Sequence, residues 1–423
     1  MTSLRFFGLA LVLAPAAAHG QSRDPFLSQP AGPLLRDDVA GSRQIPGYEP
    51  AGVQVGALRV LPAVTGSVEG DTNVLNRTSD KRRDVYFTLA PAVTASGGSG
   101  KAAYVLRAEA AVTRFATLAK QNRETWKLGA QASVPLAGRV TVAVSGGYAR
   151  EVEPNYAASA AATVGSPALY DQLSGEAGLS VDLGTTRLTG TAGVLRVDYR
   201  PVVQENGVVV DQSFRDQRTM TLGLKGEHGL PGGQELFAQG EYHWIDSLHA
   251  PLCCNRTSTG GNAVGGFRTQ LGHLIEAEVA AGYQWRNYRS PAFRDYAGLA
   301  WRTKLEWYAT SLVSVALTGR RDIANSGIPT AAGVVVDTLM LRVFYEMRRN
   351  LNFILTGART HDDYRDTGQT ADGETVKLEG RYVINDRYAL GAYGRHRNRS
   401  SDSSALPRLG SALEGGLSLR FTM

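Results

Sequence analysis

The chain has 423 residues, 43% of them hydrophobic, with 48 glycines, 17 tyrosines and a formal net charge of +6. After the N-terminus no stretch approaches eighteen consecutive apolar residues, which excludes transmembrane helices. The two cysteines, Cys253 and Cys254, are adjacent, which excludes a fold stapled by several disulfides and indicates a loop feature. The moderate positive charge favours anionic neighbours without identifying a function.

The first segment, residues 1–20, predicts a secretory signal peptide. Arg5 precedes an apolar run at 6–18, and Ala18-His19-Gly20 has the small-x-small pattern of a cleavage site. The run is too short to cross a bilayer as a helix. Residues 21–51 are polar and rich in Pro, Gly and Asp, so we expect an irregular periplasmic segment. The mature protein is therefore expected to work outside the cytoplasm.

From residue 52 to residue 423 the pattern changes to two-residue alternation. In one such run the apolar positions are Leu236, Ala238, Tyr242 and Trp244, and the polar positions between them are Gln239, Glu241 and His243. Alternation places the two sets on opposite faces of a strand. Charges this numerous would be prohibitive in a dry core, so the polar set is expected to face water and the apolar set lipid.

The connections between these runs alternate between long and tight. Nine longer polar segments lie at 70–83, 118–122, 151–169, 200–214, 246–262, 287–294, 323–334, 365–373 and 400–409. Eight tight turns lie between them, among them Leu230-Pro231-Gly232-Gly233. Short periplasmic turns and long external loops are typical of bacterial outer-membrane barrels. The sequence thus predicts an all-β, transmembrane, antiparallel up-and-down β-barrel of about 18 strands (alternatively 16), with both termini on the tight-turn side.

The last run ends the chain inside an amphipathic strand. Leu413, Leu417, Leu419, Phe421 and Met423 share one face. This resembles the C-terminal signal read by the barrel-insertion machinery, although Phe421 stands two residues before the end and Met423 is last. We therefore expect that machinery to be a partner of the chain.

The start of the barrel resembles a known family. Gly52-Val53-Gln54-Val55-Gly56-Ala57-Leu58-Arg59-Val60-Leu61-Pro62, followed by Gly70-Asp71-Thr72-Asn73-Val74, is similar to the β-barrel porins of type 2. Members of that family are often associated with exopolysaccharide synthesis and export. The resemblance implies an outer-membrane pore or accessory barrel for polysaccharide traffic, with an exopolysaccharide or its export complex as a partner.

Charged residues on the predicted inner face would hold water in the lumen and filter solutes by charge. A plainer interpretation is that opposite charges on neighbouring strands pair and stiffen the wall. The predicted lumen-lining residues are Arg107, Glu109, Lys225, Glu227, Glu241, Glu276, Glu278, Arg302, Lys304, Glu306, Arg342, Glu346, Lys377, Glu379 and Arg381.

Aromatic residues on the apolar face are expected at the two membrane interfaces, where outer-membrane barrels carry aromatic girdles. The predicted interface residues are Tyr242, Trp244, Tyr283, Trp285, Trp301, Trp307 and Phe421.

Basic residues near the external loops predict contacts with lipopolysaccharide phosphates or, alternatively, with an acidic polymer. They are Lys81, Arg82, Arg83, Arg286, Arg289, Arg294, Arg395, Arg397 and Arg399. One external loop differs from the others, because residues 155–169 are small and apolar rather than hydrophilic. Either it folds into the lumen as a constriction or gate, or it is an external loop with incidental alanines.

Catalytic, cofactor and metal motifs are not found, and no nucleic-acid partner is indicated. A lipid hydrolase remains an alternative, with His243 and nearby serines, or His361 beside Asp362 and Asp363, as its only candidates. The leading expectation is a pore of the cell outer membrane that passes polar solutes or exports a polysaccharide chain. The first rival is a barrel closed by its loops that serves as an accessory of a secretion system.

Overall fold

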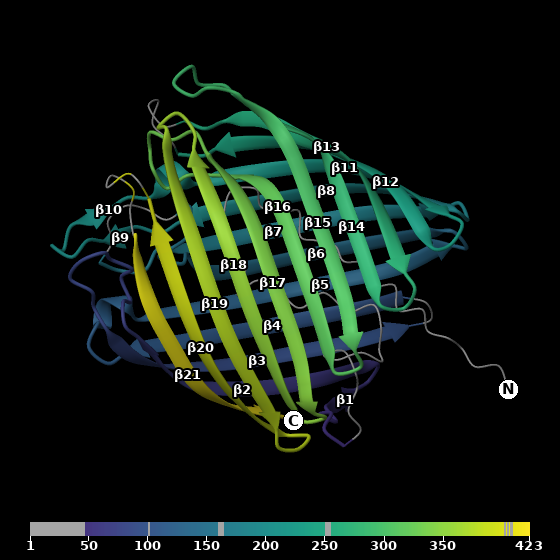
Figure 1. The fold of residues 1–423 in the computed structure, drawn as a ribbon, viewed down its shortest axis with the longest axis horizontal. Helices are drawn as coiled ribbons and strands as arrows, with labels where there is room; N and C mark the ends of the chain where they lie inside the picture. Colours follow the sequence, from purple (N-terminus) through teal and green to yellow (C-terminus); the bar gives the residue numbers. More distant parts are fainter. Residues whose placement is uncertain are drawn as a thin grey trace.

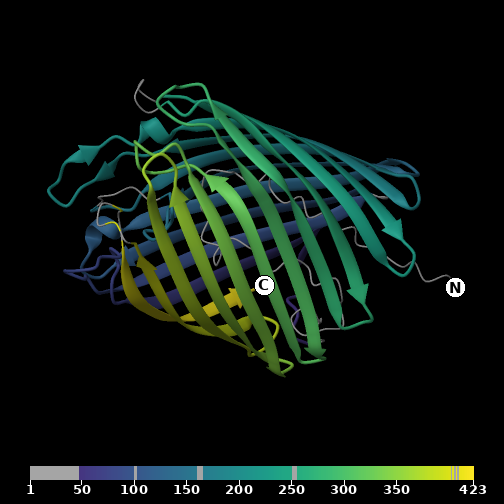
Figure 2. The ribbon, with the colours of Figure 1, turned by 45° about the horizontal axis from the view of Figure 1, so that its top comes forward.

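The computed structural model describes residues 47–99, 102–159, 165–249, 255–401, 403, 406 and 409–423. Eighteen long strands form one closed antiparallel barrel, in which each strand pairs with its neighbours in the chain and β2 pairs with β21. The strands are strongly tilted and enclose a single lumen, as Figures 1 and 2 show. The predicted barrel of 18 strands is confirmed.

The barrel strands have between 12 and 16 residues. They are β2 (Leu58–Asp71), β3 (Asp84–Ser99), β4 (Ala102–Phe115), β5 (Arg123–Ala137), β6 (Val140–Val152), β7 (Leu169–Asp182), β8 (Thr186–Tyr199), β11 (Gln217–Leu230), β12 (Gln234–Ser247), β13 (Ser258–Leu271), β14 (Ile275–Tyr288), β15 (Tyr296–Thr310), β16 (Val313–Ala324), β17 (Val334–Arg348), β18 (Leu351–Tyr364), β19 (Gln369–Val383), β20 (Tyr388–Ser400) and β21 (Gly410–Thr422).

The smaller elements lie at the two ends of the barrel. Strand β1 (Val53–Val55) pairs with the start of β2, and β9 (Val202–Val203) pairs with β10 (Val209–Val210) in a hairpin that projects at the left of Figure 1. Two single-turn 3-10 helices, η1 (Ala119–Gln121) and η2 (Ser213–Arg215), lie in long connections. Among the described residues no helix is long and apolar enough to cross a membrane.

Long and tight connections alternate along the chain, as the sequence predicts. In the tight turn between β11 and β12, Gly232 and Gly233 have φ values of +84° and +79°, which residues with a Cβ adopt at a cost. The predicted long connection at 365–373 is wrong, because β19 already begins at Gln369 and pairs it with Tyr364. The chain ends on the tight-turn side, beside the start of β2 (Figure 1).

The apolar side chains of the strands are on the outside of the barrel. Leu222 and Leu224 on β11, for example, are exposed, whereas the neighbouring Thr219 and Lys225 belong to the opposite, inward face. In the described part of the chain the buried apolar residues form four small clusters instead of one core, since the lumen replaces the core of a soluble barrel. The largest cluster lies where the long loops meet β17, β18 and β19.

Several sequence predictions fall outside the described residues. These are the signal peptide at 1–20, most of the periplasmic segment at 21–51, and the pair Cys253 and Cys254.

One close approach inside the wall gives a stability prediction. The ring of Phe237 on β12 lies over Gly266, its register partner on β13, in the space that a Cβ at position 266 would occupy. Gly266→Ala should lower the free energy of unfolding by about 1–3 kcal/mol, because the ring must leave a buried position. Gly357→Ala is the matched control, since a Cβ there meets no atom within 4 Å.

Urea titration of tryptophan fluorescence in micelles measures both variants. Equal unfolding midpoints for Gly266→Ala and Gly357→Ala would show that the Phe237 ring does not need a glycine at position 266 to keep its place.

Candidate functional site

The lumen wall carries the charged residues that the sequence predicts there. Residues directly opposite each other on neighbouring strands share a face, and the exposed apolar residues define the outer face. By this register all fifteen predicted side chains are on the inner face: Arg107, Glu109, Lys225, Glu227, Glu241, Glu276, Glu278, Arg302, Lys304, Glu306, Arg342, Glu346, Lys377, Glu379 and Arg381.

On β11 to β15 the inner charges form one paired network. Arg268 contacts Glu235 and Glu278, each at 2.7 Å, and Arg302 contacts Glu278 at 3.2 Å. Phe237 lies among these groups and is only 4% exposed, with the guanidinium carbons of Arg268 and Arg302 at 5.8 and 5.1 Å from its ring centre. This part of the wall is neutralised and stiffened by its own ion pairs.

Some inner ion pairs join residues two positions apart on one strand. Lys304 lies 2.8 Å from Glu306, and Lys377 lies 2.8 Å from Glu379. Such pairs are a direct result of alternation, because residues i and i+2 lie on the same face.

A second network crosses the seam where the first and last strands close the barrel. Arg397 contacts Asp71 at 2.7 Å and Glu414 at 2.8 Å, and the hydroxyl of Tyr393 donates at 2.6 Å to Glu414 or Glu69. Arg395 also pairs with Glu414. This network joins β20, β21 and β2 by side chains as well as by backbone hydrogen bonds.

The predicted outer-rim role of Arg395, Arg397 and Arg399 is therefore wrong. All three face the lumen, are buried and are paired with carboxylates, because alternation on β20 turns these positions inward. Arg286 is also buried on the inner face, where it donates to Asn325. The remaining predicted rim residues are exposed in the loops: Lys81, Arg82, Arg83, Arg289 and Arg294.

The loop between β6 and β7 extends over the lumen. The main-chain oxygen of Ala158 accepts a hydrogen bond at 2.7 Å from Tyr364 at the end of β18, and the oxygen of Tyr156 accepts one from Arg399. Strands β18 and β6 lie far apart around the barrel. Of the two interpretations of this loop, the inward fold agrees with its described residues, while 160–164 lie outside them.

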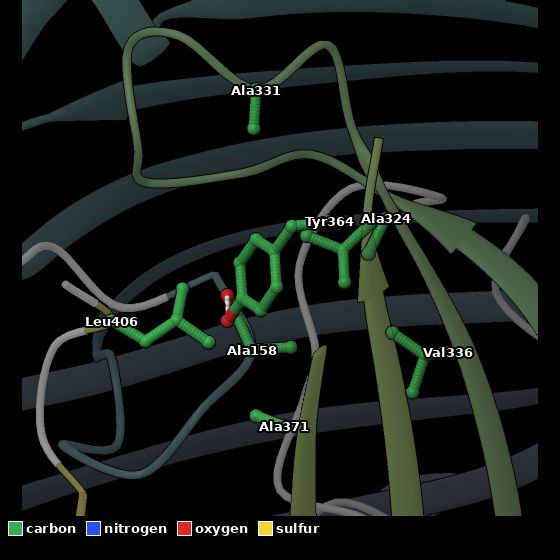
Figure 3. Packing of buried hydrophobic residues seen from close by; sticks show 8 residues of the cluster. Ala158, Ala324, Ala331, Val336, Tyr364, Ala371 and Leu406 are labelled. Atoms are coloured by element: carbon green, nitrogen blue, oxygen red, sulfur yellow. Dashed lines mark hydrogen bonds between the residues drawn. The ribbon is translucent and has the colours of Figure 1, made fainter. Parts of the chain in front are cut away.

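Side chains from four connections pack together at this place. Ala158, Ala331 and Leu406, from three different loops, surround Tyr364, which is 1% exposed (Figure 3). Arg256 from the loop after β12 donates to the oxygens of Ala331 and Ile328 at 3.0 and 2.6 Å. The described parts of these loops are therefore connected to one another at the long-loop end of the barrel, and we call them the loop cap.

A buried ion pair fixes the base of the β6–β7 loop. Arg215 and Glu153 are 3% and 4% exposed and lie 2.5 Å apart. Arg215 also donates to the Tyr199 hydroxyl and the Ser159 oxygen, and its guanidinium stacks 3.7 Å from the Tyr199 ring centre. Burial alone would lower the pKa of Arg215, but the charge of Glu153 raises it. Arg215 therefore stays charged.

Sequence reasoning missed the residues that hold the loop cap. Arg215, Glu153, Tyr364 and Arg256 have no local pattern that predicts their contacts, and each bond joins segments far apart in the chain. The one usable signal was the apolar composition of the β6–β7 loop, which indicated that it is not an ordinary external loop.

The seven predicted interface aromatics are all on the outer face. Tyr242 and Trp244 on β12 and Tyr283 and Trp285 on β14 lie near the loop ends of their strands. Trp307 and Phe421 lie near the tight-turn ends. Trp301 stands between the two groups and covers Gly319 of the neighbouring strand. Two aromatic levels on an apolar outer face are the arrangement that a bilayer stabilises.

The hydrolase candidates do not form a catalytic arrangement. His243 is buried on the inner face and contacts Thr221 at 3.0 Å, whereas His361 is exposed on the outer face and contacts Asp372. Asp362 faces inward and pairs with Arg399, so alternation separates it from His361. Within the described ranges, no group of three or more His, Cys, Asp or Glu residues could hold a metal ion.

Comparisons with known proteins agree with this geometry. The family described as "Putative beta-barrel porin 2" matches residues 45–408. The crystal structure of Pseudomonas aeruginosa OccK2 (OpdF) in complex with glucuronate is similar over 86% of this chain and 98% of its own, with 10% identity and a TM-score of 0.50. The crystal structure of a BenF-like porin from Pseudomonas fluorescens Pf-5 is similar over 87% of this chain and 99% of its own, with 10% identity and a TM-score of 0.49. No curated protein matches the chain.

The buried ion pair gives a prediction for the loop cap. Arg215→Met leaves Glu153 buried without a cation and should destabilise the cap by about 3–5 kcal/mol. The double variant Arg215→Met/Glu153→Leu should recover much of this loss, because no uncompensated charge remains. Proteinase K cleavage of the folded protein at the β6–β7 loop measures the effect.

Arg218→Met is the control, since the exposed Arg218–Asp246 pair on the outer face should contribute at most about 1 kcal/mol. Equal cleavage rates for the single and double variants at Arg215 would contradict the proposed role of the pair.

Proposed function

Because the chain belongs to the beta-barrel porin 2 family, we propose that it is a passive channel of the outer membrane for polar solutes, with the loop cap as its gate. The observation that carries the proposal is the closed barrel of 18 strands with charged residues on its inner face. Barrels of 16 to 18 strands are wide enough to leave an aqueous channel. Ionised side chains hold water in such a channel.

The mechanism has no chemical step. Diameter, wall charge and the position of the loops set which solutes pass. The paired network around Phe237 keeps the wall at a constant width, and the β6–β7 loop limits access from the external side. The family and the porin structures support a channel and not an enzyme.

The cargo is the finer part of the proposal. We propose small polar solutes or a polysaccharide chain, in line with the family resemblance at the start of the barrel. The OccK2 structure, determined in complex with glucuronate, is consistent with passage of an acidic sugar through a barrel of this fold.

A second candidate function is a loop-closed accessory barrel of a polysaccharide secretion system. The contacts of the loop cap favour it, because Arg215–Glu153 and Arg399–Asp362 are buried ion pairs that resist opening. The two functions differ in one property, since only the channel conducts ions.

The outer face suggests how the barrel is held in its membrane. Arg150 contacts Asp171 at 2.7 Å, Arg200 contacts the same carboxylate at 3.0 Å, and the Trp126 ring lies 4.0 Å from the Arg150 guanidinium. Together with the neighbouring Arg196–Asp198 pair, this group has three cations for two carboxylates near the loop end of the barrel. It is suited to a phosphate of the lipopolysaccharide that we propose as a neighbour.

Single-channel conductance in a planar bilayer tests the channel. Deleting residues 156–166 should raise the conductance, because it removes the segment that contacts Arg395 and Tyr364 across the mouth. The control is deletion of Asn206 and Gly207, which form the exposed tip of the β9–β10 hairpin.

Unchanged conductance after removal of 156–166 would reject the gate. A silent membrane for both the complete protein and this variant, despite verified insertion, would favour the accessory barrel.

A further inference from the structure

Two lumen arginines near the tight-turn end differ from the paired ones. Arg381 on β19 and Arg420 on β21 each stand two residues before the end of their strand, and both are exposed on the inner face. Neither forms an ion pair with any carboxylate of the described residues. Among the described residues Arg420 donates to Thr422, at 3.3 Å.

The strand between them carries only small residues at these positions. On β20, Gly391 is the register partner of Arg381, and Ala389 is the register partner of Arg420. On β20 itself a hydrogen atom and a methyl group are therefore the side chains nearest the two arginines, and the hydroxyl of Ser418, the register partner of Gly391 on β21, lies over Gly391. Arg381, Arg420 and the Ser418 hydroxyl thus face the lumen together.

This arrangement is unfavourable without an anion. Like charges on neighbouring positions of a sheet repel each other, and Glu379, the carboxylate that stands two residues before Arg381 on the same face, is paired with Lys377 instead. Arg268 shows the alternative in the same lumen, because three glutamates lie within 4 Å of it. A carboxylate or phosphate between Arg381 and Arg420 could accept paired hydrogen bonds from both planar donors.

Two more inner arginines extend the positive surface to either side. Arg342 on β17 and Arg107 on β4 also have no carboxylate partner within the described part of the chain. The four arginines are spread over the wall from β17 through the seam to β4, a stretch that also carries the paired carboxylates of the seam network. The glutamate-rich network of β11 to β15 occupies the other part of the circumference.

We propose that Arg381 and Arg420 form an anion-binding subsite of the lumen, which selects solutes that carry a carboxylate or phosphate group. The proposal rests on the channel function above and names the class of its solutes. Since the subsite lies at the tight-turn end, which we assign to the periplasm, an anion leaving the cell meets it before the loop cap.

Reversal potentials in a KCl gradient test the subsite. The unaltered channel should prefer chloride, and the permeability ratio of chloride to potassium should fall by about threefold or more in Arg381→Gln/Arg420→Gln. Arg218→Gln/Arg359→Gln is the matched control, because it removes two positive charges from the outer face and should keep the ratio. Equal ratios in the unaltered channel and the lumen variant would overturn the proposal.

Thermal unfolding with inorganic pyrophosphate provides a test that needs no conductance. Pyrophosphate should raise the midpoint of the unaltered protein and of the control, and should not raise that of Arg381→Gln/Arg420→Gln. Without pyrophosphate the lumen variant should be at least as stable as the unaltered protein, because its repulsion is gone. Arg381→Lys/Arg420→Lys should retain part of the shift, since the charge remains and the paired donors are lost.

The two proposals fail in different ways. A silent bilayer with a pyrophosphate shift that depends on Arg381 and Arg420 rejects the channel and keeps the subsite. Conduction with no such shift and no change of selectivity keeps the channel and rejects the subsite.

Discussion

Closure of the sheet between β2 and β21 is the constraint on which the rest of the structure depends. In a bilayer each backbone N–H and C=O needs a partner within the protein, and a closed sheet provides one without leaving an edge. The seam pairs Ala63 with Thr422 and continues to Asp71 with Glu414. Pro62, which has no N–H, lies at its end and accepts a hydrogen bond from Met423 through its oxygen.

Closure also decides where charge can be placed. Once the outer face is apolar, each second residue of a strand faces the lumen, and charged side chains there need either water or a partner. The network of Arg268, Glu278 and Arg302 meets that need with partners, whereas Arg381 and Arg420 face the lumen without them. The wall thus combines networks of paired charges with two arginines that have no carboxylate partner among the described residues.

The long loops are held in place both by apolar packing and by charged groups. The β6–β7 loop carries small apolar residues, which pack on Tyr364, and its ends are held by charge-assisted bonds to Arg215 and Arg399. Buried ion pairs of this kind contribute little to net stability but strongly disfavour arrangements that separate them. The loop cap is therefore a specific arrangement of long connections and not a loose covering.

The sequence by itself determined the barrel and the alternation of faces along its strands, although its assignment of Arg286, Arg395, Arg397 and Arg399 to the outer rim was wrong. The period of two is a local property, so the inner position of Lys304 and Glu306, and even their pairing, follow from alternation alone. Only the tertiary structure decided that Arg399 meets Asp362, that Arg215 meets Glu153, and that Arg381 and Arg420 lie on either side of β20. These contacts depend on strand register and on the paths of loops around a closed ring, which join residues far apart in the chain and leave no periodic signal in it.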